Sequence, residues 1–184
     1  MSRAVKQSGF TLIELLLAMS FISILLLAIA MTIIQIGNVY NRGMILKEIN
    51  QVARSLSSDI SRTVSTSEPF TLDAAGHRYV ITPAGGRLCL GQYSYIWNYA
   101  KALADDNRDI SVYASDPEQI KFIKVPDIGS NYCSGDNNYK DINKDGAVEM
   151  LRGGDRDLSI HSFTVYSNES AVDSTTGQRL YTIT

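Results

Sequence analysis

An almost entirely apolar run of 25 residues from Phe10 to Ile34 contains one charged side chain, that of Glu14. As a helix this run would be about 37 Å long at about 1.5 Å per residue, which exceeds the thickness of a bilayer's hydrocarbon core. A carboxylate at that depth costs on the order of 3 kcal/mol, so a plain membrane anchor gains nothing from it. The sequence therefore predicts a membrane helix in which Glu14 has a function.

Two basic residues, Arg3 and Lys6, precede the apolar run, as they would in a secretory signal peptide. The run is longer than the apolar region of a signal peptide, carries a charge near its start and is not followed by a small-x-small cleavage site. A signal anchor fits these features better, with the basic end in the cytoplasm and the rest of the chain exported. From hydropathy alone, a plain single-pass anchor is the simplest interpretation.

The stretch SGFTLIE, residues 8–14, closely resembles the processing site of type IV prepilins and type II secretion pseudopilins. In that family, prepilin peptidase removes a short basic leader that ends in glycine, and the newly exposed residue, usually phenylalanine, becomes N-methylated. The resemblance implies cleavage between Gly9 and Phe10 and methylation of Phe10. It also implies that Glu14 serves assembly, because its carboxylate pairs with the N-terminal ammonium of a neighbouring subunit and sets the axial register of the packed helices.

The same resemblance implies a single-pass protein of the inner membrane whose C-terminal part is exported and which then enters a pilus or pseudopilus. Its expected partners are other pilin or pseudopilin subunits, the prepilin peptidase and the membrane. Type IV pili, type II secretion and DNA uptake use subunits with the same N-terminal pattern, so the machine stays open. A signal-anchored surface adhesin or receptor that does not polymerise is the alternative function.

The helix is expected to continue beyond the membrane run, because apolar residues recur every three or four positions as far as Val64. No proline occurs before Pro69, whereas many pilins carry a helix-breaking proline within the membrane run. This departure favours a minor class of pilin. The expected boundaries are a leader over 1–9, a membrane or filament-core helix over 10–36, an amphipathic continuation over 37–66 and a β-rich head over 67–184.

Beyond Pro69 the pattern changes to an alternation with a period of two, interrupted by residues typical of turns, among them PAGG at 83–86 and STTGQ at 174–178. A long helix followed by antiparallel strands predicts an α+β fold, with the apolar stripe of the helix packed on one face of the sheet. The stretch ISRTVSTSEPF at 60–70, and the pairing of residues 49–64 with a late hairpin around a Thr-Gly turn, also resemble J-type minor pseudopilins and W-type minor pilins. The expected strands are 78–82, 87–97, 109–114, 119–125, 147–151, 158–167 and 179–184.

Residues 141–150, DINKDGAVEM, reproduce the first six positions of a D-x-[DN]-x-[DN]-G calcium loop. The twelfth position is Arg152 rather than the bidentate glutamate of an EF-hand, so the ligand set is incomplete. The pattern predicts a structural calcium site or, alternatively, an Asx-rich turn that needs no ion. The calcium ligands would be Asp141, Asn143, Asp145, the carbonyl of Ala147, Glu149, Asp155 and Asp157.

The two cysteines, Cys89 and Cys133, are too far apart in the sequence to form a C-x-x-C motif. In an exported, oxidising compartment two cysteines usually pair, and this disulfide would contribute about 3–4 kcal/mol by the chain-entropy estimate. Two independent buried thiols are the alternative, expected if the organism lacks oxidative folding.

Charge and motifs argue against several classes of function. The net charge is −2 and the chain has no basic cluster, which leaves no electrostatic basis for nucleic-acid binding. The two histidines, His77 and His161, lie 84 residues apart without a pattern typical of catalysis or zinc binding. G-x-S-x-G, H-E-x-x-H and phosphate-binding glycine motifs do not occur either. The chain is therefore expected not to be an enzyme.

Overall fold

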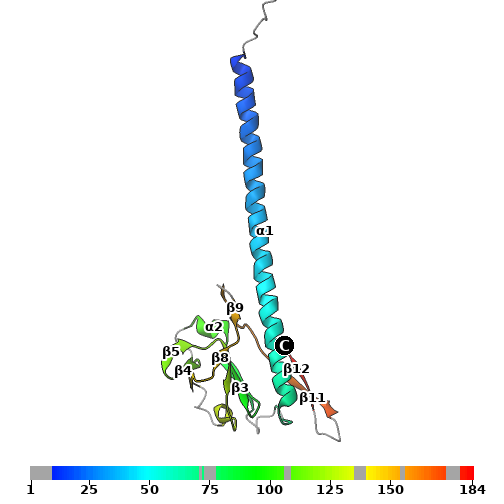
Figure 1. Ribbon diagram of the computed structural model, residues 1–184, viewed down its shortest axis with the longest axis vertical. Coiled ribbons are helices and arrows are strands. Elements are labelled where there is room, and N and C mark those ends of the chain that lie inside the picture. Colours follow the sequence, from blue (N-terminus) through cyan, green and yellow to red (C-terminus); the bar gives the residue numbers. More distant parts are fainter. Residues whose placement is uncertain are drawn as a thin grey trace, which may run out of the picture. The chain divides into compact units, whose positions relative to one another are not determined.

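The computed structural model describes residues 10–70, 72, 78–105, 109–134, 140–153, 156–172 and 179–184. The fold is α+β, as the sequence predicted, with one long helix followed by a mainly antiparallel sheet domain. The chain divides into two compact units, Met1–Lys47 and Glu48–Thr184. We call the second unit the head. Helix α1 (Leu12–Thr66) runs through both units without interruption, so the single helix expected over 10–66 is confirmed (Figure 1).

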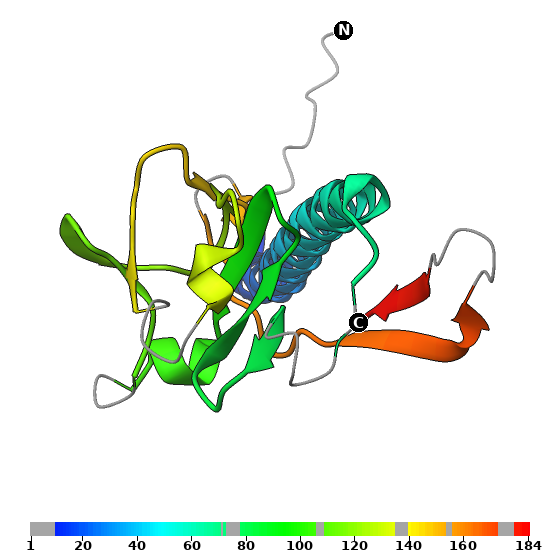
Figure 2. The same ribbon diagram turned by 90° about the horizontal axis from the view of Figure 1, so that it is seen from below.

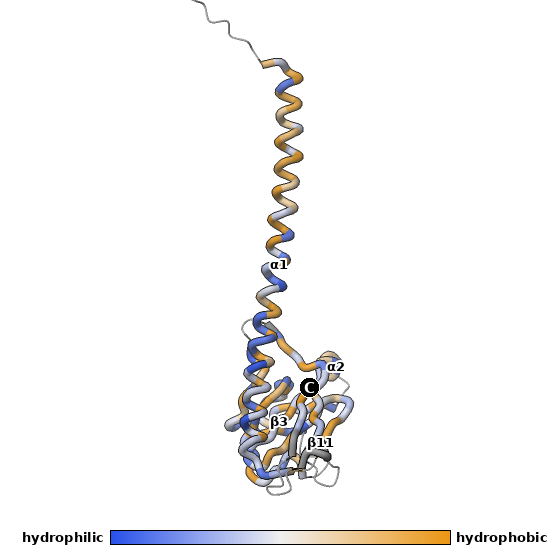
Figure 3. The backbone as a smooth tube through the Cα atoms, turned by 90° about the vertical axis from the view of Figure 1, so that its right-hand side faces the viewer, coloured by the Kyte–Doolittle hydropathy of each residue, from blue (hydrophilic) through white to orange (hydrophobic). Residues whose placement is uncertain are grey.

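In the first unit the side chains of α1 are mostly apolar, and no described side chain of this unit is buried (Figure 3). The hydroxyls of Ser20, Ser23 and Thr32 donate hydrogen bonds of 2.8–2.9 Å to backbone carbonyls three or four residues earlier. Because these hydroxyls are satisfied inside the helix, they add little to the cost of placing it in lipid. By length and composition, α1 is the one helix in the described part of the chain that would cross a membrane.

The central sheet of the head has five antiparallel strands in the order β1-β2-β3-β6-β8. The stretch 87–97, expected to be one strand, belongs to two strands separated by a turn in which Gly91 has a φ of +91°. The apolar alternation of Leu88 and Leu90 resumes one position out of phase at Tyr93 and Tyr95, and the turn lies at this shift. The strands are β1 (Tyr79–Ile81), β2 (Gly85–Cys89), β3 (Tyr93–Asn98), β6 (Phe122–Pro126) and β8 (Val148–Glu149).

Smaller elements surround the central sheet (Figure 2). Several have only two to four residues, which is too short for a periodic pattern to reveal them. The expected turn at 174–178 lies outside the described residues. One sheet has the order β5-β4-β7, with β4 and β7 parallel, and two pairs of strands, β9–β10 and β11–β12, complete the head. The bounds are α2 (Ala100–Leu103), β4 (Val112–Tyr113), β5 (Asp116–Gln119), η2 (Asn131–Cys133), β7 (Asp141–Ile142), β9 (Arg152–Gly153), β10 (Arg156–Asp157), β11 (Val165–Val172) and β12 (Arg179–Ile183).

The central sheet is covered on both faces. On one face the expected apolar stripe of α1 packs against the sheet, with Ile60 fully buried and Val52, Leu56 and Val64 partly buried. The sheet side of this core contains Trp97, which is also fully buried. On the opposite face, Ile96, Ile123 and Val125 of the central sheet form a second core. They pack against the sheet formed by β5, β4 and β7, which contributes Tyr113, Ile142 and the adjoining Ile120. The alternation of the strands thus serves two cores, one on each face.

Two glycines, expected in a turn over 83–86, lie in β2 where Trp97 approaches the backbone. A Cβ atom on Gly86 would overlap the Trp97 ring and would lie 2.8 Å from the carbonyl oxygen of Val80. A Cβ atom on Gly85 would overlap the backbone of Trp97. These glycines are therefore needed for the close approach of two strands around a large ring. Gly85 also closes the turn between β1 and β2, where its carbonyl accepts a hydrogen bond from the Thr82 N–H at 2.8 Å.

Candidate functional site

The first turn of α1 contains a hydrogen-bonded pair, Thr11 and Glu14. One carboxylate oxygen of Glu14, Oε2, accepts hydrogen bonds from the Thr11 N–H at 3.0 Å and from the Thr11 hydroxyl at 2.8 Å. The Thr11 carbonyl in turn accepts hydrogen bonds from the N–H groups of Glu14 and Leu15 at 3.1 and 3.3 Å. Thr11 is thus the N-cap residue, and Glu14 takes the third helical position, from which glutamate satisfies the N–H of the cap.

The contact between Thr11 and Glu14 leaves the acid accessible. Both residues follow the expected cleavage point, so removal of the leader would not disturb their contact. The Glu14 side chain is exposed, and its second oxygen, Oε1, accepts no hydrogen bond from the described residues. Phe10 is also exposed, and Gly9 lies outside the described residues. A cation from another chain can therefore reach Glu14 without first breaking the cap.

A polar cluster holds α1 on the central sheet. Lys124 of β6 donates hydrogen bonds to both carboxylate oxygens of Asp59 at 3.0 Å and to the Thr63 hydroxyl at 3.1 Å. The Tyr95 hydroxyl donates to Asp59 Oδ2 at 2.7 Å and also lies 2.7 Å from the Thr63 hydroxyl oxygen. Since apolar packing alone would allow the helix to slide, these directional contacts set its position along the strands.

The hydroxyl of Tyr95 remains protonated in this cluster. Burial raises the pKa of Tyr95 well above its usual value near 10. The hydrogen bond with Thr63 opposes this rise, and the carboxylate of Asp59 adds to it. A neutral hydroxyl is the form that can donate to Asp59, so the contact persists throughout the physiological pH range.

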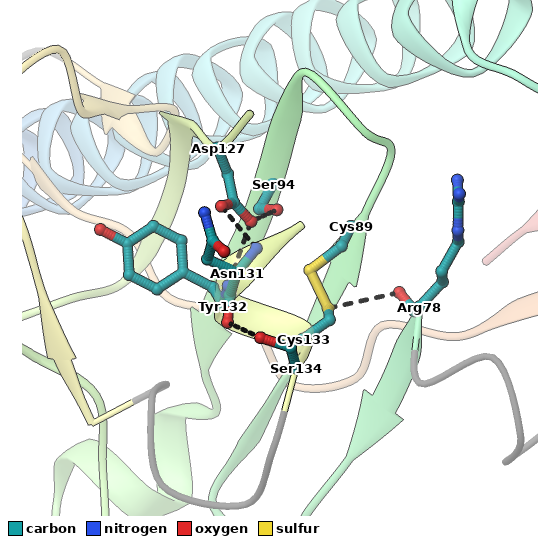
Figure 4. The surroundings of a disulfide bond; sticks show 8 residues. All are labelled: Arg78, Cys89, Ser94, Asp127, Asn131, Tyr132, Cys133 and Ser134. Atoms are coloured by element: carbon teal, nitrogen blue, oxygen red, sulfur yellow. Dashed lines mark hydrogen bonds between the residues drawn. A yellow bond between two sulfur atoms is a disulfide. The ribbon is translucent and has the colours of Figure 1, made fainter. Parts of the chain in front are cut away.

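A disulfide joins Cys89 of β2 to Cys133 of η2, with the Cα atoms 6.2 Å apart and both side chains buried (Figure 4). The same loop is held by the buried carboxylate of Asp127, which accepts hydrogen bonds from the Ser94 hydroxyl at 2.6 Å and from the Asn131 N–H at 2.8 Å (Figure 4). We call residues 127–134 the disulfide loop. Its covalent and hydrogen-bonded attachments fix it to the central sheet.

The predicted calcium ligands fall into two groups, those within the loop at 141–147 and those that follow it in the sequence. Asp141 lies in β7, and the side chain of Asn143 accepts a hydrogen bond from the Asp145 N–H at 3.0 Å, which forms an Asx turn. Ala147 is half-buried and its N–H donates to the Lys144 carbonyl at 3.1 Å. The loop therefore holds its shape through local hydrogen bonds.

The outer candidates for calcium ligation have other partners. The carboxylate of Glu149 accepts hydrogen bonds from the N–H groups of Phe122, Lys121 and Leu151 at 2.9, 3.2 and 3.3 Å. Asp157 forms an ion pair with Lys121. Asp155 lies outside the described residues. Among the residues that are described, no three His, Cys, Asp or Glu side chains are grouped so that they would hold a metal ion.

Calcium binding at this loop stays a prediction with a direct test. We expect millimolar Ca²⁺ to raise the melting temperature of the metal-stripped protein in detergent and EGTA to reverse the effect. An ion that binds only the folded state adds about 2.7 kcal/mol at a hundredfold excess over Kd. The double substitution Asp141→Ala with Asp145→Ala should remove the response, whereas Asp116→Ala, outside the loop, should keep it. An unchanged melting curve would leave an Asx-rich turn that needs no ion.

A groove of about 890 Å³ in the head was not anticipated from the sequence. One wall is the end of α1, and the disulfide loop and the turn between β2 and β3 form the other parts. Arg62, Arg78 and Lys124 line it together with Asp59 and Glu68. These five residues come from three separate segments of the chain, so no local motif signals the groove.

Residues 5–30 match the prokaryotic N-terminal methylation motif, and this range includes Gly9, Phe10 and Glu14. No curated protein and no solved structure matches the chain. The match ends before the segments that carry the resemblance to J- and W-type subunits. Together with the long apolar helix, the motif fits membrane anchoring in a structural, non-enzymatic protein. The methylation motif thus supports a type IV pilin-like protein that is processed by prepilin peptidase and assembles with other pilins.

Proposed function

We propose that this chain is a minor pilin or pseudopilin, most similar to the J- or W-type subunits, that enters a type IV pilus-like filament or stands at its tip. Prepilin peptidase cleaves it between Gly9 and Phe10 and methylates Phe10. One observation carries the proposal: Glu14 is exposed in the first turn of a membrane-length apolar helix. No other described residue of that helix turn is charged, so the acid has no partner for its charge among the described residues.

Cleavage supplies the missing partner. Hydrolysis of the bond after Gly9 creates an ammonium group on Phe10, and methylation keeps its positive charge. Two opposite unit charges about 4 Å apart attract each other by roughly 4 kcal/mol at an effective dielectric constant near 20. Packing between leucine and isoleucine side chains is not directional, so this ion pair would decide where an incoming helix stops along its neighbour.

The first unit also requires an apolar environment. Its large side chains are exposed along the whole segment, among them Leu16, Phe21 and Ile34, each more than 60% accessible. An apolar surface of this extent is stable in lipid or against other apolar helices, but not in water. Lipid before assembly and neighbouring subunits after it would cover the same surface.

The processing step can be tested by the intact mass of the protein extracted from membranes. We expect a chain that lacks residues 1–9 and carries one additional methyl group on Phe10. The variant Gly9→Val should keep its leader and stay in the membrane, because the family's leader ends in glycine. A wild-type chain that still begins with Met1 or Ser2 would favour the alternative, a signal-anchored adhesin or receptor that does not polymerise.

A further inference from the structure

The groove beside the disulfide loop has an excess of positive charge. Its lining contains three basic side chains, those of Arg62, Arg78 and Lys124, against two acidic ones, those of Asp59 and Glu68. Lys124 is neutralised by Asp59, with which it forms an ion pair at 3.0 Å. Among the described residues, neither arginine forms an ion pair. The groove therefore offers two guanidinium groups to an acid that binds there.

Arg78 is the better placed of the two arginines for an ion pair. Its side chain is half-buried, its Nη1 atom is buried without a hydrogen-bond partner in the described part of the chain, and it points away from the disulfide (Figure 4). Because burial has removed part of the water around this guanidinium, an ion pair formed here is screened less than one at an exposed site. The planar group also presents several N–H donors in a fixed arrangement that fits a carboxylate. Arg62 is exposed and adds to the attraction.

The rim of the groove adds an apolar contact. Ile128 directly precedes Gly129 of the lining and is 84% exposed, and Tyr93, which also lines the groove, is 39% exposed. The N–H groups on either side of Ile128, those of Asp127 and Gly129, donate to carbonyls in the turn between β2 and β3 at 2.9 and 3.1 Å. Since the loop is held in place, binding loses little free energy in ordering it. A free carboxylate would leave this apolar surface exposed, whereas a peptide segment with an acidic and an apolar side chain covers it.

The size and charge of the groove favour a segment of a different protein chain. Its volume of about 890 Å³ is far larger than one carboxylate and is typical of sites that enclose a ligand of several residues' size. On this head, the exposed Asp141 and Asp145 are flanked by Lys140 and Lys144, so their loop carries no net negative charge. A minor subunit, moreover, has subunits of other kinds as its neighbours.

We propose that the groove binds an acidic segment of a different pilin subunit beside this one in the filament, with a carboxylate paired to Arg78 and an apolar side chain on Ile128. The proposal rests on the proposed function, since it requires incorporation next to other subunits. The contact would select the neighbour, because a neutral or basic segment at this place leaves Arg78 without an acid. The Glu14 pairing carries no such selectivity, since every subunit processed in the same way exposes an N-terminal ammonium group.

A photo-crosslinking amino acid in place of Gln92 identifies the neighbour. Gln92 is exposed and lines the groove. The full-length chain is expressed with its filament machinery and irradiated in sheared filaments, and the cross-linked peptide is sequenced by mass spectrometry. We expect a peptide of another pilin subunit with an Asp or Glu within about three residues of the cross-link, since three extended residues span roughly 10 Å. The same crosslinker at Arg54, exposed on α1 and outside the groove, is the control and should not yield this peptide.

Charge reversal then tests the ion pair. Arg78→Glu should lower cross-linking to that subunit by about tenfold or more, because like charges placed opposite each other are strongly unfavourable. Replacing the identified acid by arginine in the same cells should restore it, and Arg54→Glu should leave it unchanged. Formation of the Cys89–Cys133 disulfide reports whether each variant folds. Should Arg78→Glu fail that check, Arg62→Glu, at an exposed position of the same groove, decides the question with the same reversal.

Several outcomes would overturn the contact. It is wrong if the cross-link joins two copies of this chain, reaches a segment without an acid or captures no protein, which a polysaccharide or a free anion in the groove would produce. It is also wrong if Arg78→Glu cross-links like the wild type. Leader cleavage and incorporation are measured in the same samples. A cleaved, incorporated chain that is indifferent to charge reversal refutes the contact and leaves the proposed function intact, whereas an uncleaved wild-type chain that is absent from filaments overturns both.

Discussion

Replacing Glu14 by alanine should leave membrane insertion intact and remove most of the protein from the filament fraction. Insertion should persist because removing a carboxylate lowers the cost of burying the helix by about 3 kcal/mol. Incorporation should fall by about tenfold or more, because roughly 4 kcal/mol of attraction to the N-terminal ammonium is lost at the docking step. Quantitative immunoblots of membranes and sheared filaments measure both quantities.

Two further variants separate the charge of Glu14 from its part in the helix cap. Glu14→Gln keeps an oxygen that accepts from the Thr11 N–H but lacks the charge. Thr11→Val keeps the charge and removes the hydroxyl bonded to Glu14 Oε2. If the ion pair with a neighbour is the function, Gln should fail like Ala and Thr11→Val should assemble. Normal assembly of Glu14→Gln would instead assign the acid to capping α1.

The substitution Gly86→Ala should destabilise the head by about 3 kcal/mol and lower its melting temperature by about 10 °C. The added Cβ would overlap the ring of Trp97 and press on the Val80 carbonyl. Trp97 is fully buried, and its ring packs against those of Phe122 and Phe163, so it cannot move aside without opening the core. The chain has one tryptophan, and its fluorescence during thermal unfolding of the detergent-solubilised protein reports on this site.

Gly43→Ala is the matched control for this substitution. Gly43 lies in α1, and a Cβ there would have no atom within 4 Å. Alanine is the better helix former by about 1 kcal/mol, so this variant should melt at or above the wild-type temperature. Equal melting of Gly86→Ala and the wild type would mean that the ring of Trp97 has room that the structure does not show.

The strand boundaries illustrate where sequence periodicity stops being informative. Alternation predicted correctly that residues 87–89 and 93–97 are extended, because successive side chains of a strand point to opposite faces. The prediction of one strand missed the reversal at Gly91, although the alternation shifts by one residue between Leu90 and Tyr93. Pairing of β2 with β3 and of β3 with β6 decides where the strands end. That pairing depends on residues far apart in the chain.

The calcium-like loop shows the same limit for a site. Spacing placed Glu149 among seven expected ligands, because a calcium loop is recognised by positions along the chain. In the fold, the Glu149 carboxylate accepts hydrogen bonds from the N–H groups of Lys121, Phe122 and Leu151, and its role as a calcium ligand stays a prediction. A short motif carries no information about which neighbouring strand will compete for its side chains.

Local sequence patterns specified the long apolar helix, its continuation to the head, the α+β class and the processing motif around Gly9, Phe10 and Glu14. These features depend on neighbouring residues or on apolar side chains that recur every two to four residues, so local interactions suffice to specify them. Folding, in contrast, established that Gly86 makes room for Trp97, that Asp59 and Lys124 fix α1 on the sheet, and that Arg62 and Arg78 share a groove. Those relations arise when folding buries apolar surface and brings distant segments together, so no short stretch of the sequence contains them.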